Sequence, residues 1–185
     1  MNDKTLFKAL IFGALLAGVA SVITLTHRGD DEPRKIVPVK AVGKRVLMPA
    51  VEMSSTSGQK WTLAEHKGRI VLVNFWATWC GPCRKETPDL VRVYEKYRGR
   101  GVTIAGISMD QKPREVVPKF AERYGIEYPL LVPGDDTALS DSIETIPTSF
   151  LVDQQGRIAK TFRGVIHEAE LASNIEELLA EGNGS

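Results

Sequence analysis

Two cysteines are the residues best suited to do chemistry in this chain. Cys80 and Cys83 are the only cysteines among 185 residues, and Gly81 and Pro82 separate them. A thiol attacks a disulfide as the thiolate, and its ordinary pKa is about 8.5, so a reactive pair needs surroundings that stabilise the anion. A secreted domain held together by disulfides would carry more cysteines, spread more widely. The pattern therefore predicts a redox-active pair that alternates between dithiol and disulfide.

Other uses of the pair fit the sequence less well. A structural zinc site needs two further ligands, and the three histidines offer no paired spacing. Covalent haem attachment needs a histidine directly after Cys83, where this chain has Arg84. A purely structural disulfide across so short a loop would constrain little of the chain. We therefore expect no metal site and no cofactor beyond the Cys80–Cys83 disulfide.

The pair follows a predicted strand and begins a predicted helix. Residues 69–76 form a near-continuous run of β-branched and aromatic residues, which is typical of a strand buried on both faces. Apolar residues then recur at helical spacing up to Gly99. Cys80 is thus expected at a helix N-terminus, where free N–H groups and the helix dipole stabilise a thiolate. We expect Cys80 to attack and Cys83, one turn inside the helix, to resolve the mixed disulfide.

The wider pattern predicts one α/β domain over residues 47–181, with a short C-terminal tail over 182–185. A buried strand, two strands of a hairpin and a final amphipathic helix are expected at 102–108, 149–152, 157–162 and 169–179. A β-α-β unit followed by a hairpin and a terminal helix makes a layered α/β domain. Hydrophobic residues make up 43% of the chain, enough for a core, and the net charge of +1 argues against a nucleic acid partner.

The N-terminus carries a second informative pattern. Residues 9–26 contain no charged side chain, and as a helix they would span about 27 Å, close to the hydrocarbon thickness of a bilayer. Lysines precede this run, which favours a cytoplasmic tail over residues 1–8 and an extracytoplasmic remainder. The run could also be a signal peptide cut after Ala20, or a buried core helix. We expect a transmembrane anchor, followed by a spacer over residues 27–46.

The segment around the cysteines resembles a known family. The string Trp79-Cys80-Gly81-Pro82-Cys83, placed after a buried strand, is similar to thioredoxin. The run from Leu72 to Trp79, together with the leading apolar segment, is more similar to the membrane-anchored TlpA and ResA branch of thioredoxin-like proteins. The resemblance covers residues 47–181. It implies a thioredoxin fold, in which helices flank a central mixed β-sheet, here preceded by an N-terminal transmembrane helix.

The resemblance also implies a substrate-binding surface. Pro147 resembles the family's cis-proline, which faces the disulfide and presents the backbone of the preceding residue, here Ile146, to a bound peptide as a strand-like edge. A trans proline at the start of a strand is the alternative. Trp79 and Pro82 are expected to shape the surface around Cys80.

Glu86 is the third residue that we expect to be catalytic. Thioredoxins carry a buried aspartate on the strand just before Phe-Trp, whereas this chain has Asn74, which cannot shuttle protons. Glu86 lies three residues after Cys83 and hence on the same helix face, and ResA-like proteins place a glutamate there. Partial burial would raise its pKa toward a range useful for proton transfer. The alternative is a solvated glutamate that the helix dipole favours.

Together these observations predict an extracytoplasmic thiol–disulfide oxidoreductase, held in the cytoplasmic membrane by a single span. Gly81-Pro82 matches the dipeptide of reducing thioredoxins, whose potential is about −270 mV, so reduction of protein disulfides is the expected direction. The resemblance implies a membrane electron donor of the DsbD or CcdA type. It also implies extracytoplasmic substrates such as apocytochrome c during cytochrome c maturation. Two alternatives stay open: a peptide-binding module with a holdase or assembly role, and a thiol peroxidase.

Overall fold

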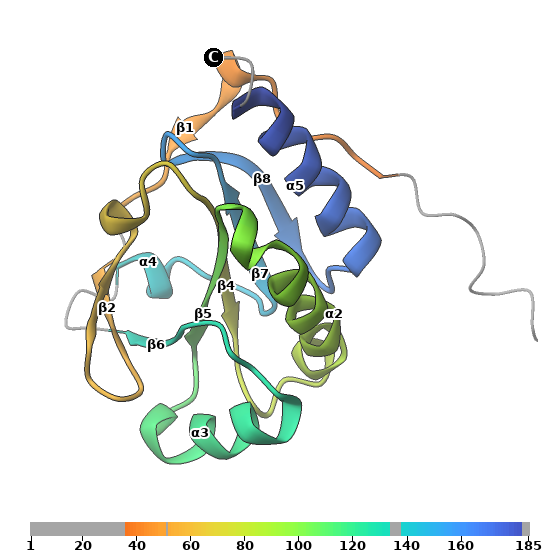
Figure 1. The fold of residues 1–185 in the computed structure, drawn as a ribbon. Helices are drawn as coiled ribbons and strands as arrows, with labels where there is room; N and C mark the ends of the chain where they lie inside the picture. The colour runs from red at the N-terminus through yellow and green to blue at the C-terminus, as the bar shows by residue number, and fades with distance from the viewer. Residues whose placement is uncertain (1–35, 51, 134–137, 183–185) are drawn as a thin grey trace, which may run out of the picture. The chain divides into compact units, whose positions relative to one another are not determined.

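The structure is a computed structural model that describes residues 36–50, 52–133 and 138–182. Its strands form one eight-stranded mixed sheet in the order β1-β8-β7-β4-β5-β6-β2-β3 (Figure 1). In chain order the strands are β1 (Val46–Leu47), β2 (Glu52–Ser55), β3 (Lys60–Thr62), β4 (Ile70–Trp76), β5 (Val102–Ser108), β6 (Leu130–Pro133), β7 (Thr148–Val152) and β8 (Arg157–Arg163). The helices are α2 (Gly81–Tyr97), α3 (Pro113–Tyr124), α4 (Ala138–Asp141) and α5 (Glu168–Gly182), with short 3₁₀ turns η1 (Val42–Lys44), η2 (Leu63–His66) and η3 (Arg98–Arg100).

Strand β4, which leads to the cysteines, lies inside the sheet. It pairs in parallel with β5 on one side and antiparallel with β7 on the other. All seven of its residues are buried, as the run of β-branched and aromatic residues predicted. Its side chains alternate between the two faces of the sheet. The side chains on one face, Ile70, Leu72 and Trp76, join the larger hydrophobic cluster. Those on the other face, Val71, Val73 and Phe75, join the smaller one.

Two long helices fix the end of β4 from one side. Helices α2 and α5 contact each other and lie side by side in Figure 1. They bury apolar side chains in the same cluster, Leu90 and Val93 from α2 and Leu171 and Ile175 from α5. Burial of this apolar area is the main force that holds α2 against the sheet. The first turn of α2, which carries the cysteines, is thereby held at the carboxyl end of β4. The mixed sheet with flanking helices is the layered arrangement that the sequence predicted.

Part of the expected spacer belongs to this domain. The compact unit begins at Ile36, and Val39 and the Arg45 side chain are buried in it. The Lys40 backbone N–H donates to the carbonyl oxygen of Ala159, 2.8 Å away. The prediction of a spacer over 27–46 and of a domain starting at residue 47 is therefore wrong for residues 36–46. The contacts that hold this segment come from residues more than 100 positions later, which a local pattern does not show.

The expected membrane anchor over 9–26 and the tail over 1–8 lie outside the described residues. Within the part of the chain that the structure describes, no helix is long and apolar enough to cross a membrane.

Candidate active site

Cys80 occupies the N-cap position of α2, where the sequence placed it. The backbone N–H of Cys83 donates to Cys80 Sγ over 3.2 Å, and the two residues form a disulfide. Pro82 lies in the first turn, where a helix leaves N–H groups unpaired, so its missing N–H costs no hydrogen bond. Once the disulfide is reduced, the same N–H and the helix dipole stabilise negative charge on Cys80 Sγ. The local geometry thus suits Cys80 for the role of nucleophile.

The two cysteines differ in accessibility. Cys80 is 4% exposed, whereas Cys83 is 0% exposed and sits among the core residues of α2. A partner sulfur therefore reaches Cys80 first, and Cys83 is reached from within the protein. The neighbouring Trp79 is 68% exposed, and Pro82 is exposed beside it. These two side chains form part of the surface next to Cys80.

The loop before β7 brings a second segment to the cysteines. The peptide bond between Ile146 and Pro147 is cis, as the resemblance implied. Cys80 Sγ lies 3.8 Å from the carbonyl oxygen of Ile146, although the two residues are 66 positions apart. Pro147 is buried and Ile146 is half-buried, so the backbone of Ile146 flanks the disulfide at the surface. The four predicted substrate-binding residues thus gather around Cys80.

A carboxylate holds the loop that precedes Cys80. Asp110, just after β5, accepts hydrogen bonds from the backbone N–H and the hydroxyl of Thr78, at 3.0 and 2.6 Å. It also accepts a hydrogen bond from the hydroxyl of Ser108 at 2.8 Å. This contact was not predicted from the sequence. The available signal was that Ser108 ends a buried strand parallel to β4, at the edge of the sheet where the cysteines lie, and that Asp110 follows two residues later.

Glu86 is buried on the face of α2 that also carries Cys83. Its side chain accepts two hydrogen bonds, one at each oxygen: from Asn74 Nδ2 to Oε1 over 2.9 Å, and from the Ile166 N–H to Oε2 over 3.0 Å. The pKa of Glu86 is raised to about 7, and burial is the largest cause. The two hydrogen bonds favour the ionised form and lower the pKa, whereas the charge of Asp89 raises it. The alternative of a solvated glutamate is therefore wrong. A carboxyl with this pKa can take up and release a proton near neutral pH.

Asn74 has a structural part in the site that the sequence analysis did not assign. Its Nδ2 group donates to Ser149 Oγ over 2.9 Å as well as to Glu86. Asn74 and Ser149 are paired residues of β4 and β7, and both are almost fully buried. Tyr128, near the start of β6, is close enough for the charge of Glu86 to raise its pKa, although burial is the larger cause. Among the described residues, no group of histidine, cysteine and acidic side chains is placed to hold a metal ion.

A cysteine pair in the first turn of a helix, beside a cis-proline and on a mixed sheet, is the arrangement of a thioredoxin-fold thiol–disulfide oxidoreductase. Residues 45–161 match the model of the AhpC/TSA family. ResA from Geobacillus thermodenitrificans, named a thiol-disulfide oxidoreductase, is 31% identical over 139 residues, which cover 75% of this chain and 79% of the relative. ResA from Bacillus cereus is 27% identical over 178 residues and covers 96% of this chain and 98% of its own length.

Solved structures agree with these relatives. A thioredoxin-family thiol:disulfide interchange protein from Chlorobium tepidum has a TM-score of 0.66 and 30% identity, covering 75% of this chain and 99% of its own. A DsbF homologue from Corynebacterium diphtheriae has a TM-score of 0.69 and 29% identity, covering 79% of this chain and 95% of its own. The chain therefore belongs to the AhpC/TSA family and, within it, is a ResA-like thiol–disulfide oxidoreductase.

Proposed function

We propose that this oxidoreductase is a membrane-tethered reductase of protein disulfides outside the cytoplasm. The observation that carries the proposal is the hydrogen bond from the Cys83 N–H to Cys80 Sγ. Cys80 is the more accessible of the two cysteines, which Gly81 and Pro82 separate. A stabilised Cys80 thiolate is the form that attacks a substrate disulfide. The Gly-Pro dipeptide is that of thioredoxin, whose potential of about −270 mV makes it a reductant.

The reaction passes two electrons from the cysteine pair to the substrate. The Cys80 thiolate attacks one sulfur of the substrate disulfide, so that a mixed disulfide forms and the first substrate thiolate leaves and takes up a proton. Cys83 then gives its proton to the Glu86 carboxylate and attacks Cys80 Sγ. The Cys80–Cys83 bond forms, and the second substrate thiolate leaves. The disulfide in the structure is the oxidised product of this cycle.

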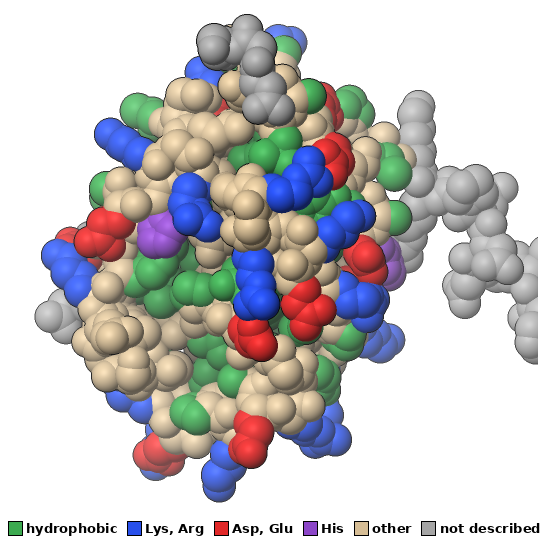
Figure 2. All heavy atoms as spheres, viewed as in Figure 1, with side chains coloured by type: hydrophobic (Ala, Val, Ile, Leu, Met, Phe, Trp, Pro, Cys, Tyr) green, Lys and Arg blue, Asp and Glu red, His purple; other side chains and the backbone are tan. Residues whose placement is uncertain are grey.

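The surface around Cys80 suits an extended peptide. The backbone of Ile146, held by the cis bond to Pro147, offers polar groups next to the disulfide for strand-like pairing. The exposed ring of Trp79 and the exposed Pro82 supply apolar contacts next to Cys80. Figure 2 shows basic and acidic side chains interspersed on the viewed face, which supports a protein rather than a nucleic acid partner.

The proposed setting is the extracytoplasmic side of the cytoplasmic membrane. The uncharged run over 9–26 after two lysines supports an anchor, and the Bacillus cereus relative matches nearly the whole chain. An oxidising compartment would convert the pair to the disulfide, so a membrane electron donor of the DsbD or CcdA type must return it to the dithiol. Apocytochrome c is the proposed substrate because its cysteines must be reduced before haem is attached.

Equilibration of the full-length chain with glutathione tests the direction of the reaction. We expect a reduction potential of about −270 mV for the Cys80–Cys83 couple. A value above about −150 mV would place the pair among strong oxidants and overturn the assignment as a reductase.

Trapping in cells tests the roles of the cysteines and names the substrate. A Cys83→Ser variant cannot resolve the mixed disulfide, so we expect it to accumulate covalently bound partners, apocytochrome c among them. A Cys80→Ser variant is the matched control and should trap nothing and lose insulin reduction. Catalysis that survives in Cys80→Ser would show that Cys80 is not the nucleophile.

Three measurements test the tether. Protease added to spheroplasts should digest the domain, and carbonate washing should leave the chain in the membrane. N-terminal sequencing separates anchor from signal peptide, because cleavage after Ala20 would leave a chain that starts at Ser21.

A further inference from the structure

Asn74 is hydrogen-bonded to two side chains that can each reverse their role. Its Nδ2 group has two hydrogens, and it donates one to Glu86 Oε1 and one to Ser149 Oγ, both over 2.9 Å. A carboxyl accepts when ionised and can donate when protonated, and a hydroxyl can do either. The three side chains are buried, with Asn74 2% and Glu86 and Ser149 each 1% exposed, so bulk water cannot replace a lost contact.

Protonation of Glu86 creates a conflict in the arrangement that the structure shows. Both carboxylate oxygens already receive a hydrogen, Oε1 from Asn74 and Oε2 from the Ile166 backbone. A proton on Oε2 would face an N–H that the backbone fixes in place. A proton on the lone pair that Oε1 directs at Asn74 would face the amide hydrogens. On the remaining lone pair of either oxygen it would have no acceptor among the hydrogen bonds of the described residues. Donors that face each other in a buried site leave both unsatisfied, which is costly.

We propose that the Asn74 amide turns over by half a rotation when Glu86 takes up a proton, which makes Asn74 a positioning residue for the proton transfer. After rotation, Oδ1 accepts the hydrogen of the protonated Glu86 Oε1, and the Ser149 hydroxyl turns to donate to the same Oδ1. Asn74 then keeps its contacts with Glu86 and Ser149 in both protonation states, while Nδ2 moves to the place of Oδ1, which makes no hydrogen bond in the structure. The inference rests on the proposed role of Glu86, and it explains why asparagine stands where thioredoxins have an aspartate.

The charged and titratable groups around Glu86 do not substitute for this amide. Asp89 lies on the same helix and is paired with Arg92 and with His167, which precedes α5. Tyr128, near the start of β6, is kept neutral because burial raises its pKa. Cys83, also on α2, is part of the disulfide and does not titrate in the oxidised chain. Burial is the largest cause of the raised pKa of Glu86, the hydrogen bonds from Ile166 and Asn74 lower this pKa, and the charge of Asp89 raises it. Asn74 is the side chain that contacts Oε1.

A second buried asparagine provides an internal control. Asn174 donates from Nδ2 to the Val37 carbonyl oxygen over 3.1 Å and accepts at Oδ1 from Lys160 Nζ over 2.9 Å. A carbonyl oxygen only accepts and an ammonium group only donates, so the Asn174 amide has one satisfied orientation. The chain has four asparagines, Asn2, Asn74, Asn174 and Asn183, so selective labelling resolves both buried amides.

The test is NMR of the oxidised full-length chain in detergent, with ¹⁵N-labelled asparagine. Above the pKa of Glu86 we expect nuclear Overhauser contacts from the Asn74 amide hydrogens to the side-chain hydrogens of Glu86 and Ser149. These contacts should be lost as the pH falls through the titration of Glu86. The ¹³C chemical shift of the Glu86 carboxyl group monitors that titration. The contacts of Asn174 should stay unchanged. Asn74 contacts that persist while Glu86 titrates would overturn the proposal.

Glu86→Gln is the matched variant. With its oxygen facing the Ile166 N–H, the side-chain amide of this variant would present hydrogens to Asn74, as protonated Glu86 does. At every pH measured, we expect the Asn74 contacts of the variant to match those that the wild type shows at low pH. Contacts that match the high-pH wild type would contradict the rotation. The insulin-reduction rate of the same variant reports on the proton-transfer role alone, so the two proposals can fail separately.

Discussion

At the scale of single residues, Glu86 couples folding stability to pH in an unusual direction for a carboxyl. Its pKa rises from 4.5 to about 7 in the folded protein, chiefly because of burial. Between these values the folded chain holds a proton that the unfolded chain has released, so stability is fully present below pH 4.5 and is lost as the pH rises through 7. A shift of this size corresponds to ~3 kcal/mol.

The Glu86→Gln variant removes this pH dependence because glutamine does not ionise. We expect its free energy of unfolding, measured by urea denaturation, to fall less than that of the wild type between pH 5 and pH 8. The difference should be about 2.5 kcal/mol, because pH 5 already lies above the unfolded pKa of 4.5. Other titrating groups contribute equally to both proteins and cancel. Parallel pH profiles for the two proteins would show that Glu86 is ionised throughout.

The sequence revealed the residues of the site that lie close together in the chain. The spacing of Cys80, Cys83 and Glu86 places them on one helix by local geometry, and the family resemblance supplied Pro147. The partners of Glu86 were not predictable in this way. Ser149 depends on the register of β7 against β4, and Ile166 lies 80 positions from Glu86 in the loop before α5. Such contacts arise from tertiary packing, which leaves no periodic signal in the sequence.

At the scale of elements, the carboxylate of Asp110 ties the end of β5 to the loop before Cys80. Removing it in Asp110→Ala leaves the Thr78 N–H without its acceptor, a loss of about 1–3 kcal/mol for a hydrogen bond to a charged group. We expect hydrogen exchange of the Thr78 amide to speed up at least about tenfold, with a lower rate of insulin reduction. Thr78→Val keeps the backbone contact and is the milder control. Unchanged exchange in Asp110→Ala would mean that packing alone orders the loop.

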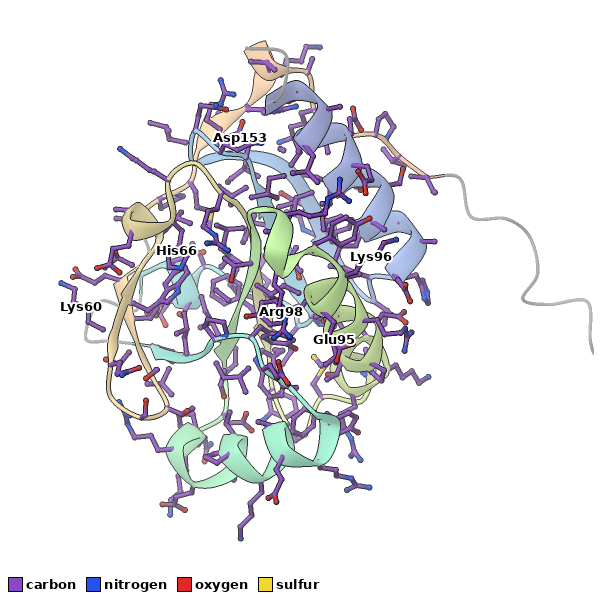
Figure 3. The ribbon with its side chains drawn as sticks, viewed as in Figure 1. Lys60, His66, Glu95, Lys96, Arg98 and Asp153 are labelled. Atoms are coloured by element: carbon purple, nitrogen blue, oxygen red, sulfur yellow. A yellow bond between two sulfur atoms is a disulfide. The ribbon has the colours of Figure 1, made fainter. Side chains whose placement is uncertain are left out.

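The segment before β1, which was predicted to be part of the spacer, is held by ion pairs of the buried Arg45 side chain. Arg45 contacts Asp153 at 3.2 Å and Glu181 at 2.7 Å, and its side chain is 1% exposed. Asp153 directly follows β7 and is labelled in Figure 3. The same figure labels Lys60, which lies on the hairpin of β2 and β3. A run of charged residues with prolines is typical of a solvated linker, and only the fold shows that one of these charges is internal.

Arg45→Ala should destabilise the domain because it leaves the buried Asp153 with Arg157 as its remaining cationic partner. Breaking a buried pair in this way costs about 3 kcal/mol, which urea denaturation would detect as a lower midpoint. Lys60→Ala is the control, since its pair with Glu52 is exposed and should contribute nothing measurable. Equal midpoints for the two variants would show that Asp153 finds compensation elsewhere.

At the scale of the whole molecule, the segment over 36–46 is held by residues of β8 and α5 and, among the described residues, makes no hydrogen bond to those around the cysteines. Val37 presents its carbonyl oxygen to Lys160 and Asn174, and the Val39 N–H donates to Glu177 over 3.2 Å. Strand β4 begins at Ile70 and ends next to the active site at Trp76, about 20 Å later. Stability and redox chemistry are therefore expected to separate.

Two truncated chains test this separation. A chain over residues 36–185 keeps the contacts of Val37, Val39 and Arg45, whereas a chain over 47–185 loses them and leaves Lys160 and Asp153 with fewer partners. We expect the shorter chain to be less stable by at least about 3 kcal/mol in urea. Both should show the same Cys80–Cys83 potential under native conditions, because the helix N-terminus that sets it is intact. If the two chains unfolded at the same urea concentration, the domain would begin at residue 47 after all, and the segment over 36–46 would act only as a tether.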